Sequence, residues 1–72
     1  MENFYIITMK TRKGKKLYLS VWDGKPEWTF NKNLACFWDF EDKALDFAKR
    51  WFKNFKDWEV EEVKVNVYEE IF

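Results

Sequence analysis

The chain contains no histidine, one cysteine and one serine, and each shortage disfavours a class of chemistry. Without histidine there is no ordinary catalytic triad and no imidazole general base. A conventional zinc site is disfavoured as well, because one thiol cannot supply the missing ligands. Cys36 has no intramolecular disulfide partner and lies in an aromatic run, so we interpret it as a buried structural thiol. A free thiol is also typical of a reducing compartment.

Glycine, net charge and long apolar runs are also scarce. The two glycines, Gly14 and Gly24, are too few for a phosphate-binding loop, and thirteen basic residues balance thirteen acidic ones. Zero net charge argues against a general polyanion binder. No run approaches the roughly 18 apolar residues of a membrane span, and the start does not resemble a signal peptide. We therefore expect a cytoplasmic, non-enzymatic protein that needs no cofactor, no metal and no membrane.

Aromatic residues are what the chain has in abundance. Eight Phe, five Trp and three Tyr stand among 72 residues, which form a single domain over residues 1–72. A domain of this size has a marginal core and often needs a disulfide or a metal as a staple. Large aromatic side chains bury much apolar surface each, and they can supply the stability that a staple provides in other small domains.

The strongest periodic pattern is an amphipathic helix over residues 39–56. Asp39 is suited to the N-cap, and acids at the start and basic residues towards the end complement the helix dipole. Ala44 and Ala48 lie near the middle of the apolar arc, where small side chains let a helix approach a sheet. At 100° per residue, an arc of about 160° collects Phe40, Ala44, Leu45, Phe47, Ala48, Trp51, Phe52 and Phe55. We predict that this arc packs in the core.

Two strands and a turn begin the chain. Residues 3–10 are apolar on both faces, which is typical of a central strand. Residues 16–22 alternate and form a second strand. Between them, residues 11–15 form a turn in which Gly14 can adopt a positive φ.

The middle of the chain is harder to assign. Asp23 and Gly24 are a strong hairpin signal, which makes residues 27–30 a short third strand. Residues 31–33 form a polar loop. Residues 34–38 fit either a short strand or a 3₁₀ turn, and we favour an extended segment whose aromatics pack beneath the helix start.

The last strand, residues 57–68, has a fault in its alternation. Apolar residues occupy even positions before Glu61 and odd positions after Glu62. One extra residue there, a β-bulge, would return them to one face. Residues 69–72 we expect to be frayed.

The resulting fold is α+β, with element order β-β-β-α-β, a small antiparallel sheet and one amphipathic helix on one face. The first strand is central, with the last strand at its free side. We assign two apolar sets to the two faces of the sheet. One comprises Phe4, Ile6, Leu17, Leu19 and Val21, and the other comprises Tyr5, Ile7, Met9, Tyr18 and Trp22.

Acidic residues are clustered in two places. Asp39, Glu41 and Asp42 have the chemistry of a magnesium site, but the helix dipole already explains acids at a helix start, so we predict no metal there. A second cluster is interpreted as a solvated or partner-facing edge of the last strand, and it comprises Glu59, Glu61, Glu62, Glu69 and Glu70.

A basic hairpin favours nucleic-acid binding. It carries Lys10, Arg12, Lys13, Lys15 and Lys16 within seven positions. Four aromatics that we place together on the adjoining sheet face would be stacking platforms for bases, namely Tyr5, Tyr18, Trp22 and Trp28. The zero net charge and the acidic last strand oppose this function. The simpler interpretation is a solvated hairpin that protects a sheet edge.

The count of apolar faces favours protein binding instead. One helix covers one face, whereas both faces of the sheet carry aromatic side chains. Exposed Trp and Tyr are typical of protein interfaces. We therefore predict a protein-binding domain that uses the same four aromatics and the basic hairpin. Its partner is another protein or a second copy packed sheet to sheet, and single-stranded nucleic-acid binding is the alternative.

Residues 18–51 resemble a loose pattern of small proteins encoded by phages and prophages: a hairpin with a tryptophan, an Ala-x-x-aromatic stretch, then a helix with repeated Ala and Phe. The matching residues are Trp28, Ala35, Trp38, Ala44, Phe47 and Ala48. Most such proteins have no assigned activity, and some inhibit host defence systems, including CRISPR effectors, by binding them. The resemblance implies a phage-type accessory protein or inhibitor in a bacterial cytoplasm, and it carries no functional residues across.

Overall fold

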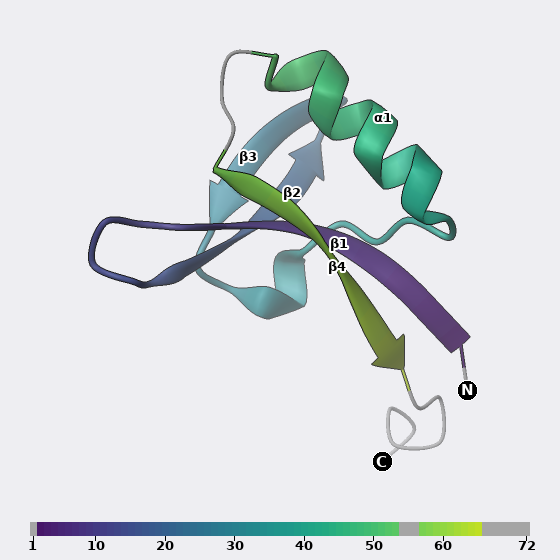
Figure 1. The fold of residues 1–72 in the computed structure, drawn as a ribbon, viewed down its shortest axis with the longest axis horizontal. Helices are drawn as coiled ribbons and strands as arrows, with labels where there is room; N and C mark the ends of the chain where they lie inside the picture. Colours follow the sequence, from purple (N-terminus) through teal and green to yellow (C-terminus); the bar gives the residue numbers. More distant parts are fainter. Residues whose placement is uncertain (1, 54–56, 66–72) are drawn as a thin grey trace.

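The computed structural model describes residues 2–53 and 57–65 of the chain. The elements are β1 (Glu2–Lys10), β2 (Lys16–Trp22), β3 (Lys25–Thr29), the 3₁₀ helix η1 (Lys32–Leu34), α1 (Glu41–Trp51) and β4 (Trp58–Val65). The strands form one antiparallel sheet in the order β3-β2-β1-β4, and α1 lies across one of its faces (Figure 1). The predicted α+β class and the central place of β1 are confirmed.

Strand register determines which side chains share a face. Met9 lies opposite Leu17, Ile7 lies opposite Val60, and Leu19 lies opposite Trp28. Opposed residues point to the same side of an antiparallel sheet. These side chains lie on the side covered by α1, which we call the helix face. The other side, the open face, carries Phe4, Ile6, Thr8, Lys16, Tyr18, Ser20, Trp22, Glu59, Glu61 and Val63.

Two alanines seat α1 on the sheet. Ala44 and Ala48 are fully buried against Ile7 and Leu19, so small side chains allow a close approach of helix to strands. Partly buried side chains surround this centre, namely Tyr5, Trp28, Trp38, Phe47, Phe52, Trp58 and Val60. The predicted packing of the apolar arc in the core is therefore confirmed for its middle.

Both ends of α1 differ from the predicted 39–56. The N-cap is Phe40, in extended backbone and without a side-chain hydrogen bond, and not Asp39. At the other end the helix stops at Trp51, and Phe52 leaves the helical region while its amide still donates to the Ala48 carbonyl. The Phe52 ring packs on Trp28 at 5.3 Å, so apolar periodicity continues after the helix has ended. Residues 54–56 lie outside the described part.

The two turns follow the glycine signals. Gly14 has φ +82°, as predicted for the turn after β1. Asp23 and Gly24 have φ of 50° and 75°, the pair of positive values that a type I′ hairpin turn requires. Because that turn is tight, β3 starts at Lys25, two residues before the predicted 27–30, and it ends at Thr29.

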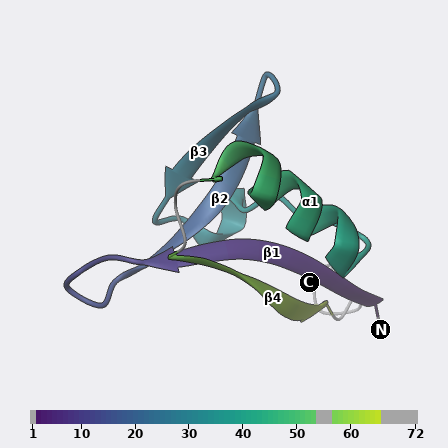
Figure 2. The ribbon, with the colours of Figure 1, turned by 45° about the horizontal axis from the view of Figure 1, so that its top comes forward.

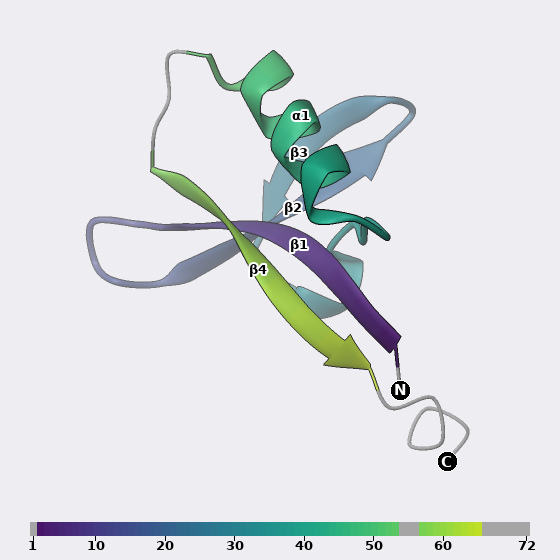
Figure 3. The same ribbon diagram turned by 45° about the vertical axis from the view of Figure 1, so that its right-hand side comes forward.

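Residues 35–38, the connecting segment, lie between β1 and β2 where these strands diverge. β1 and β2 pair only over Thr8–Lys10 and Lys16–Tyr18. Beyond that, the Cys36 amide donates to the Leu19 carbonyl at 2.9 Å, while Trp38 and Tyr5 exchange two hydrogen bonds of 2.9 Å. Figures 2 and 3 show the divergence of β2 from β1. For residues 34–38 the favoured extended segment is found from Ala35 onwards, whereas the 3₁₀ helix covers Lys32–Leu34 and falls mainly in the predicted polar loop 31–33.

β4 contains no bulge in its described part, and the predicted bulge at Glu61-Glu62 is wrong. Eight consecutive residues pair with β1 in one unbroken register, from Trp58 to Val65. Trp58 and Val60 consequently lie on the helix face, and Val63 lies on the open face. Val63 is opposite Phe4, whose ring meets Phe37 of the connecting segment at 5.8 Å. The apolar side chains change face because different elements cover the two ends of β4. Residues 66–72, including the predicted frayed end, lie outside the described part.

Candidate interaction surfaces

The four aromatics predicted to share one open face lie on two faces. Tyr5 and Trp28 point to the helix face and pack around the buried centre of the core. Tyr18 and Trp22 point to the open face, where Trp22 is 57% exposed. The predicted division of the apolar residues between faces is therefore wrong, because Tyr5, Ile7 and Met9 belong with the leucines of β2. A role for the four aromatics in partner binding stays a prediction.

The open face is less open than predicted. Ile6, Thr8 and Ser20 on this face are only 2%, 1% and 3% exposed. One cover is Phe37, which contacts Phe4 edge-on. A second is η1, which packs against β2. The expectation of a continuous aromatic surface on this side of the sheet is wrong for its centre.

An ion pair crosses the open face above β1. Lys16 of β2 and Glu61 of β4 are joined at 2.6 Å, and the Lys16 ammonium lies 6.0 Å from the centre of the Tyr18 ring. The hydrogen bond to Glu61 is the main cause that raises the pKa of Lys16. Burial alone would raise the pKa of Glu61, but the hydrogen bond from Lys16, a polar contact with Thr8 and the charges of Lys16 and Lys32 outweigh it and lower that pKa.

The contribution of Thr8 to that lowered pKa is a loose polar contact. Its hydroxyl is buried and makes no hydrogen bond of standard geometry. Hydrogen bonds weaken steeply when distance or angle departs from the usual range, so this contact is weaker than the hydrogen bond from Lys16.

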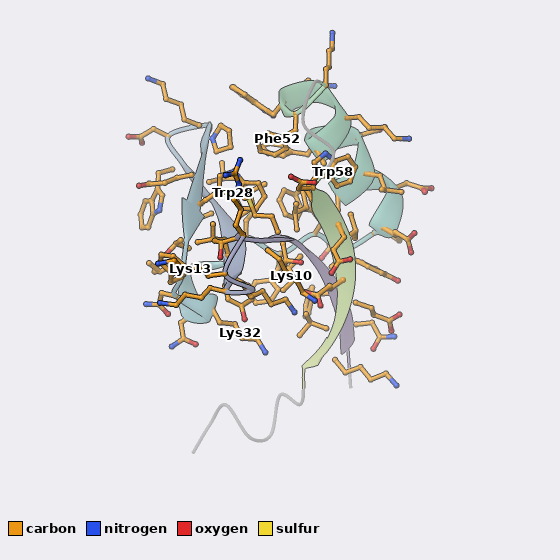
Figure 4. All side chains as sticks on the ribbon, turned by 60° about the vertical axis from the view of Figure 1, so that its left-hand side comes forward. Lys10, Lys13, Trp28, Lys32, Phe52 and Trp58 are labelled. Atoms are coloured by element: carbon orange, nitrogen blue, oxygen red, sulfur yellow. The ribbon has the colours of Figure 1, made fainter. Side chains whose placement is uncertain are left out.

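Lys16, at the base of the predicted basic hairpin, and Lys32 of η1 line the same pocket. Lys10, Arg12, Lys13 and Lys15 are exposed, as predicted for a solvated turn, and Lys16 is half-buried by its ion pair. Figure 4 shows Lys10, Lys13 and Lys32 on one side, away from Trp28, Phe52 and Trp58. Lys32 comes from η1, so sequence proximity did not indicate it. A pocket of about 270 Å³ here is lined by Ile6, Lys16, Tyr18, Lys32, Glu61, Glu62, Val63 and Lys64.

One flank of α1 carries a row of aromatic side chains that were assigned to the core. We call Phe40, Phe47 and Trp51 the aromatic stripe. Phe40 is 60% exposed and Trp51 is 47% exposed, while Phe47 is half-buried between Trp38 at 5.3 Å and Trp51 at 6.1 Å. The signal was present in the sequence, because residues 40, 47 and 51 cluster at one margin of the helical arc. Other exposed large apolar residues are Trp22, Phe30, Leu34 and Phe37.

Few side chains in the described part offer reactive chemistry. Residues 2–53 and 57–65 contain no group of three His, Cys, Asp or Glu residues that could hold a metal ion. Cys36 is half-buried, and burial is the main cause that raises the pKa of its thiol, so it is a poor nucleophile at neutral pH. Within the same residues, no helix has the length and apolar character to span a membrane.

Comparison with known proteins identifies no related sequence and no similar structure. No family model matches the chain, and neither the curated proteins nor the solved structures include a significant match.

Proposed function

We propose that this domain acts by binding another protein, and that the aromatic stripe on α1 is the contact surface. The observation that carries the proposal is the exposure of Phe40, at the N-cap of α1, and of Trp51, which packs beside the half-buried Phe47. Large exposed aromatics are costly in water, and they are the side chains that dominate binding energy when a partner buries them. A partner that covers the stripe would remove apolar surface from a preformed helix.

Charges beside the stripe indicate the partner's chemistry. Lys43 and Arg50 are exposed and lie next to the stripe on the helical wheel, and the Lys43 ammonium is 5.2 Å from the centre of the Phe40 ring. An apolar surface with a basic margin fits a partner surface that is apolar at its centre and acidic at its rim. Such a domain would work by occupying a surface, which is how an accessory protein or an inhibitor of a host machine acts.

The experiment compares stripe variants with a matched control. Wild-type protein, Phe40→Ser, Trp51→Ala and Trp22→Ala would each be used to capture partners from a lysate of the source cells. The captured protein would then be purified and titrated. We expect Phe40→Ser and Trp51→Ala to weaken binding at least tenfold, since truncation of a central aromatic costs about 2 kcal/mol or more. Trp22→Ala, which removes an indole that is even more exposed than that of Trp51, should bind like wild type.

Two results would contradict the assignment. Equal affinities of wild type and both stripe variants would exclude the stripe as the contact. Loss of binding in Trp22→Ala alone would move the contact to the open face. Circular dichroism of each variant separates these results from loss of the fold.

Single-stranded nucleic-acid binding is the second candidate, and the position of Lys32 favours it. This residue adds a charge from η1 to the pocket that Lys16 and Tyr18 also line. The test is the affinity for a labelled single-stranded oligonucleotide as a function of salt. A binder would lose affinity steeply with salt, and Lys13→Glu/Lys15→Glu would abolish binding. Lys49→Glu/Lys53→Glu, on the helix side, is the matched control. Undetectable binding at low salt would exclude this candidate.

A further inference from the structure

The two edges of the sheet are unlike each other. The outer edge of β3 is short and contains Pro26, which has no N–H to offer another strand. β4 forms the other edge with eight residues, no proline, no glycine and no bulge. Regular edges of this kind are templates for strand pairing, which proteins ordinarily protect.

Hydrogen bonding at Tyr5 shows which groups β4 presents outwards. Tyr5 directs both its N–H and its C=O towards Trp38, away from β4. Tyr5 and Glu62 are therefore a non-hydrogen-bonded pair, and the N–H and C=O of Glu62 point to the free edge. By alternation along the strand, the same holds for Trp58, Val60 and Lys64.

We propose that this edge pairs antiparallel with β4 of a second copy of the chain, about a two-fold axis at Val63. In this register Val63 meets its own counterpart on the open face. Glu62 of each copy lies opposite Lys64 of the other, on the helix face. Both side chains are exposed, and neither forms an ion pair with another described residue. The two opposite-charge pairs form between residues whose backbone groups are free to bond.

Charge excludes the neighbouring registers. An axis at Glu62 or at Lys64 sets that charged side chain against its own counterpart. An axis at Glu61 does the same for Glu61 and brings Glu62 next to Val60. Like charges directly opposite in a sheet are destabilising, so the axis at Val63 is favoured. The product is a continuous eight-stranded sheet, within the usual range of sheet sizes. Among the described residues, this interface pairs residues 61–65 of the two copies and does not use the aromatic stripe, so it stands or falls independently of the proposed function.

The first test measures mass as a function of concentration by light scattering or sedimentation. Wild type should move towards twice its 9.0 kDa mass as concentration rises. Glu62→Lys and Lys64→Glu should each stay monomeric, because each sets like charges opposite. An equimolar mixture of the two variants should recover the dimer, since both pairs between positions 62 and 64 are then opposite in charge. Glu27→Lys on β3 is the control and should dimerise like wild type. A wild type that remains monomeric, or a mixture that does, would overturn the proposal.

The second test reads the register by disulfide trapping in a Cys36→Ser background. Counterpart residues at position 63 would have Cα atoms about 4.5 Å apart, within disulfide range. Counterparts at position 62 would be about 8 Å apart and those at position 61 about 14 Å apart, from the rise along a strand. Mild oxidation should therefore cross-link Val63→Cys and leave Glu62→Cys and Glu61→Cys monomeric. Preferential cross-linking at 61 or 62, or at none of the three, would refute this register.

Discussion

Replacement of Thr8 by valine should stabilise the domain. Thr8 lies in the central strand with 1% of its surface exposed, and its hydroxyl has no hydrogen-bond partner of standard geometry. A buried hydroxyl without a partner costs about 1–3 kcal/mol, because folding removes its bonds to water. Valine has nearly the same shape, keeps the β-branch that suits a strand and replaces the hydroxyl with a methyl group. We expect Thr8→Val to raise the free energy of unfolding by about 1–2 kcal/mol.

Urea unfolding followed by tryptophan fluorescence would measure this gain, with an unchanged dependence on denaturant. In a domain of this size, a gain of 1–2 kcal/mol corresponds to a rise in Tm of about 5–15 °C. Thr29→Val is the matched control for the same chemical change. The Thr29 hydroxyl accepts a hydrogen bond from the Asn31 amide at 3.1 Å, so its loss should destabilise the domain.

A destabilised Thr8→Val protein would refute the reasoning. It would mean that the Thr8 hydroxyl bonds to the Glu61 carboxylate, and the variant would then lose a bond to a charged acceptor, worth about 1.5–3 kcal/mol. Carboxyl titration by NMR distinguishes the two cases. The pKa of Glu61 should barely change in Thr8→Val if the contact is loose, and it should rise clearly if a true hydrogen bond has been removed.

Three further substitutions test other parts of the fold. Glu61→Gln should cost up to about 1 kcal/mol between about pH 5 and 10, as is usual for a partly exposed ion pair. The folded pKa of Glu61 lies below its ordinary 4.5, so the stabilisation is present above pH 4.5 and fades as the pH falls through the lower folded value. The folded pKa of Lys16 lies above 10.5, so the stabilisation is present below pH 10.5 and fades as the pH rises through the higher folded value. Urea unfolding of wild type and Glu61→Gln across pH would show both limits. A difference in the free energy of unfolding that is as large at pH 2 as at pH 7 would contradict the assignment. Gly24→Ala should lower the free energy of unfolding by about 1 kcal/mol in urea unfolding, because the φ of +75° at this position disfavours any side chain. No atom lies near an added Cβ, so this backbone strain is the only cost. An unchanged urea midpoint would mean that the turn relaxes. Ala48→Leu should cost about 1–3 kcal/mol by forcing the fully buried helix–sheet contact apart, whereas Lys49→Leu on the exposed side should cost much less, and equal losses would argue against the close seating of α1.

Alternation and turn residues were sufficient to predict most of the sheet. β2 occupies the predicted residues 16–22, and β1 differs from the prediction by one residue. The central position of β1 followed from its two apolar faces, since a strand flanked on both sides and covered above and below exposes neither face. The glycines succeeded for a simple steric reason, because both occupy backbone conformations that side chains disfavour.

Helix ends were harder to predict, because periodicity reports burial and not backbone hydrogen bonding. Phe52 fits the apolar arc and is half-buried, yet its backbone is not helical. At the other end, Trp38 is held by two hydrogen bonds to Tyr5, and the chain bends through Asp39 and Phe40 before the helix begins. A capping residue is used only when the preceding chain allows it, and that constraint comes from a strand more than thirty residues away in sequence.

The side chains that share each face of the sheet could have been predicted from the sequence, because they follow from the number of residues in the first turn. A five-residue turn over residues 11–15 makes Lys10 and Lys16 opposed neighbours, so even-numbered residues of β1 share a face with even-numbered residues of β2. The length of that turn is therefore sufficient to place Tyr18 and Trp22 on the face opposite to Tyr5. The cover over the open face could not be predicted in the same way. It depends on the insertion of residues 35–38 where β1 and β2 diverge, and no local sequence pattern encodes that contact. Once that segment buries the middle of the open face, Trp22, Phe30 and Phe37 stay exposed away from α1, and Phe40 and Trp51 stay exposed on its flank. We place the proposed protein contact on the helix because Trp51 there packs beside the half-buried Phe47, which extends the apolar surface along α1.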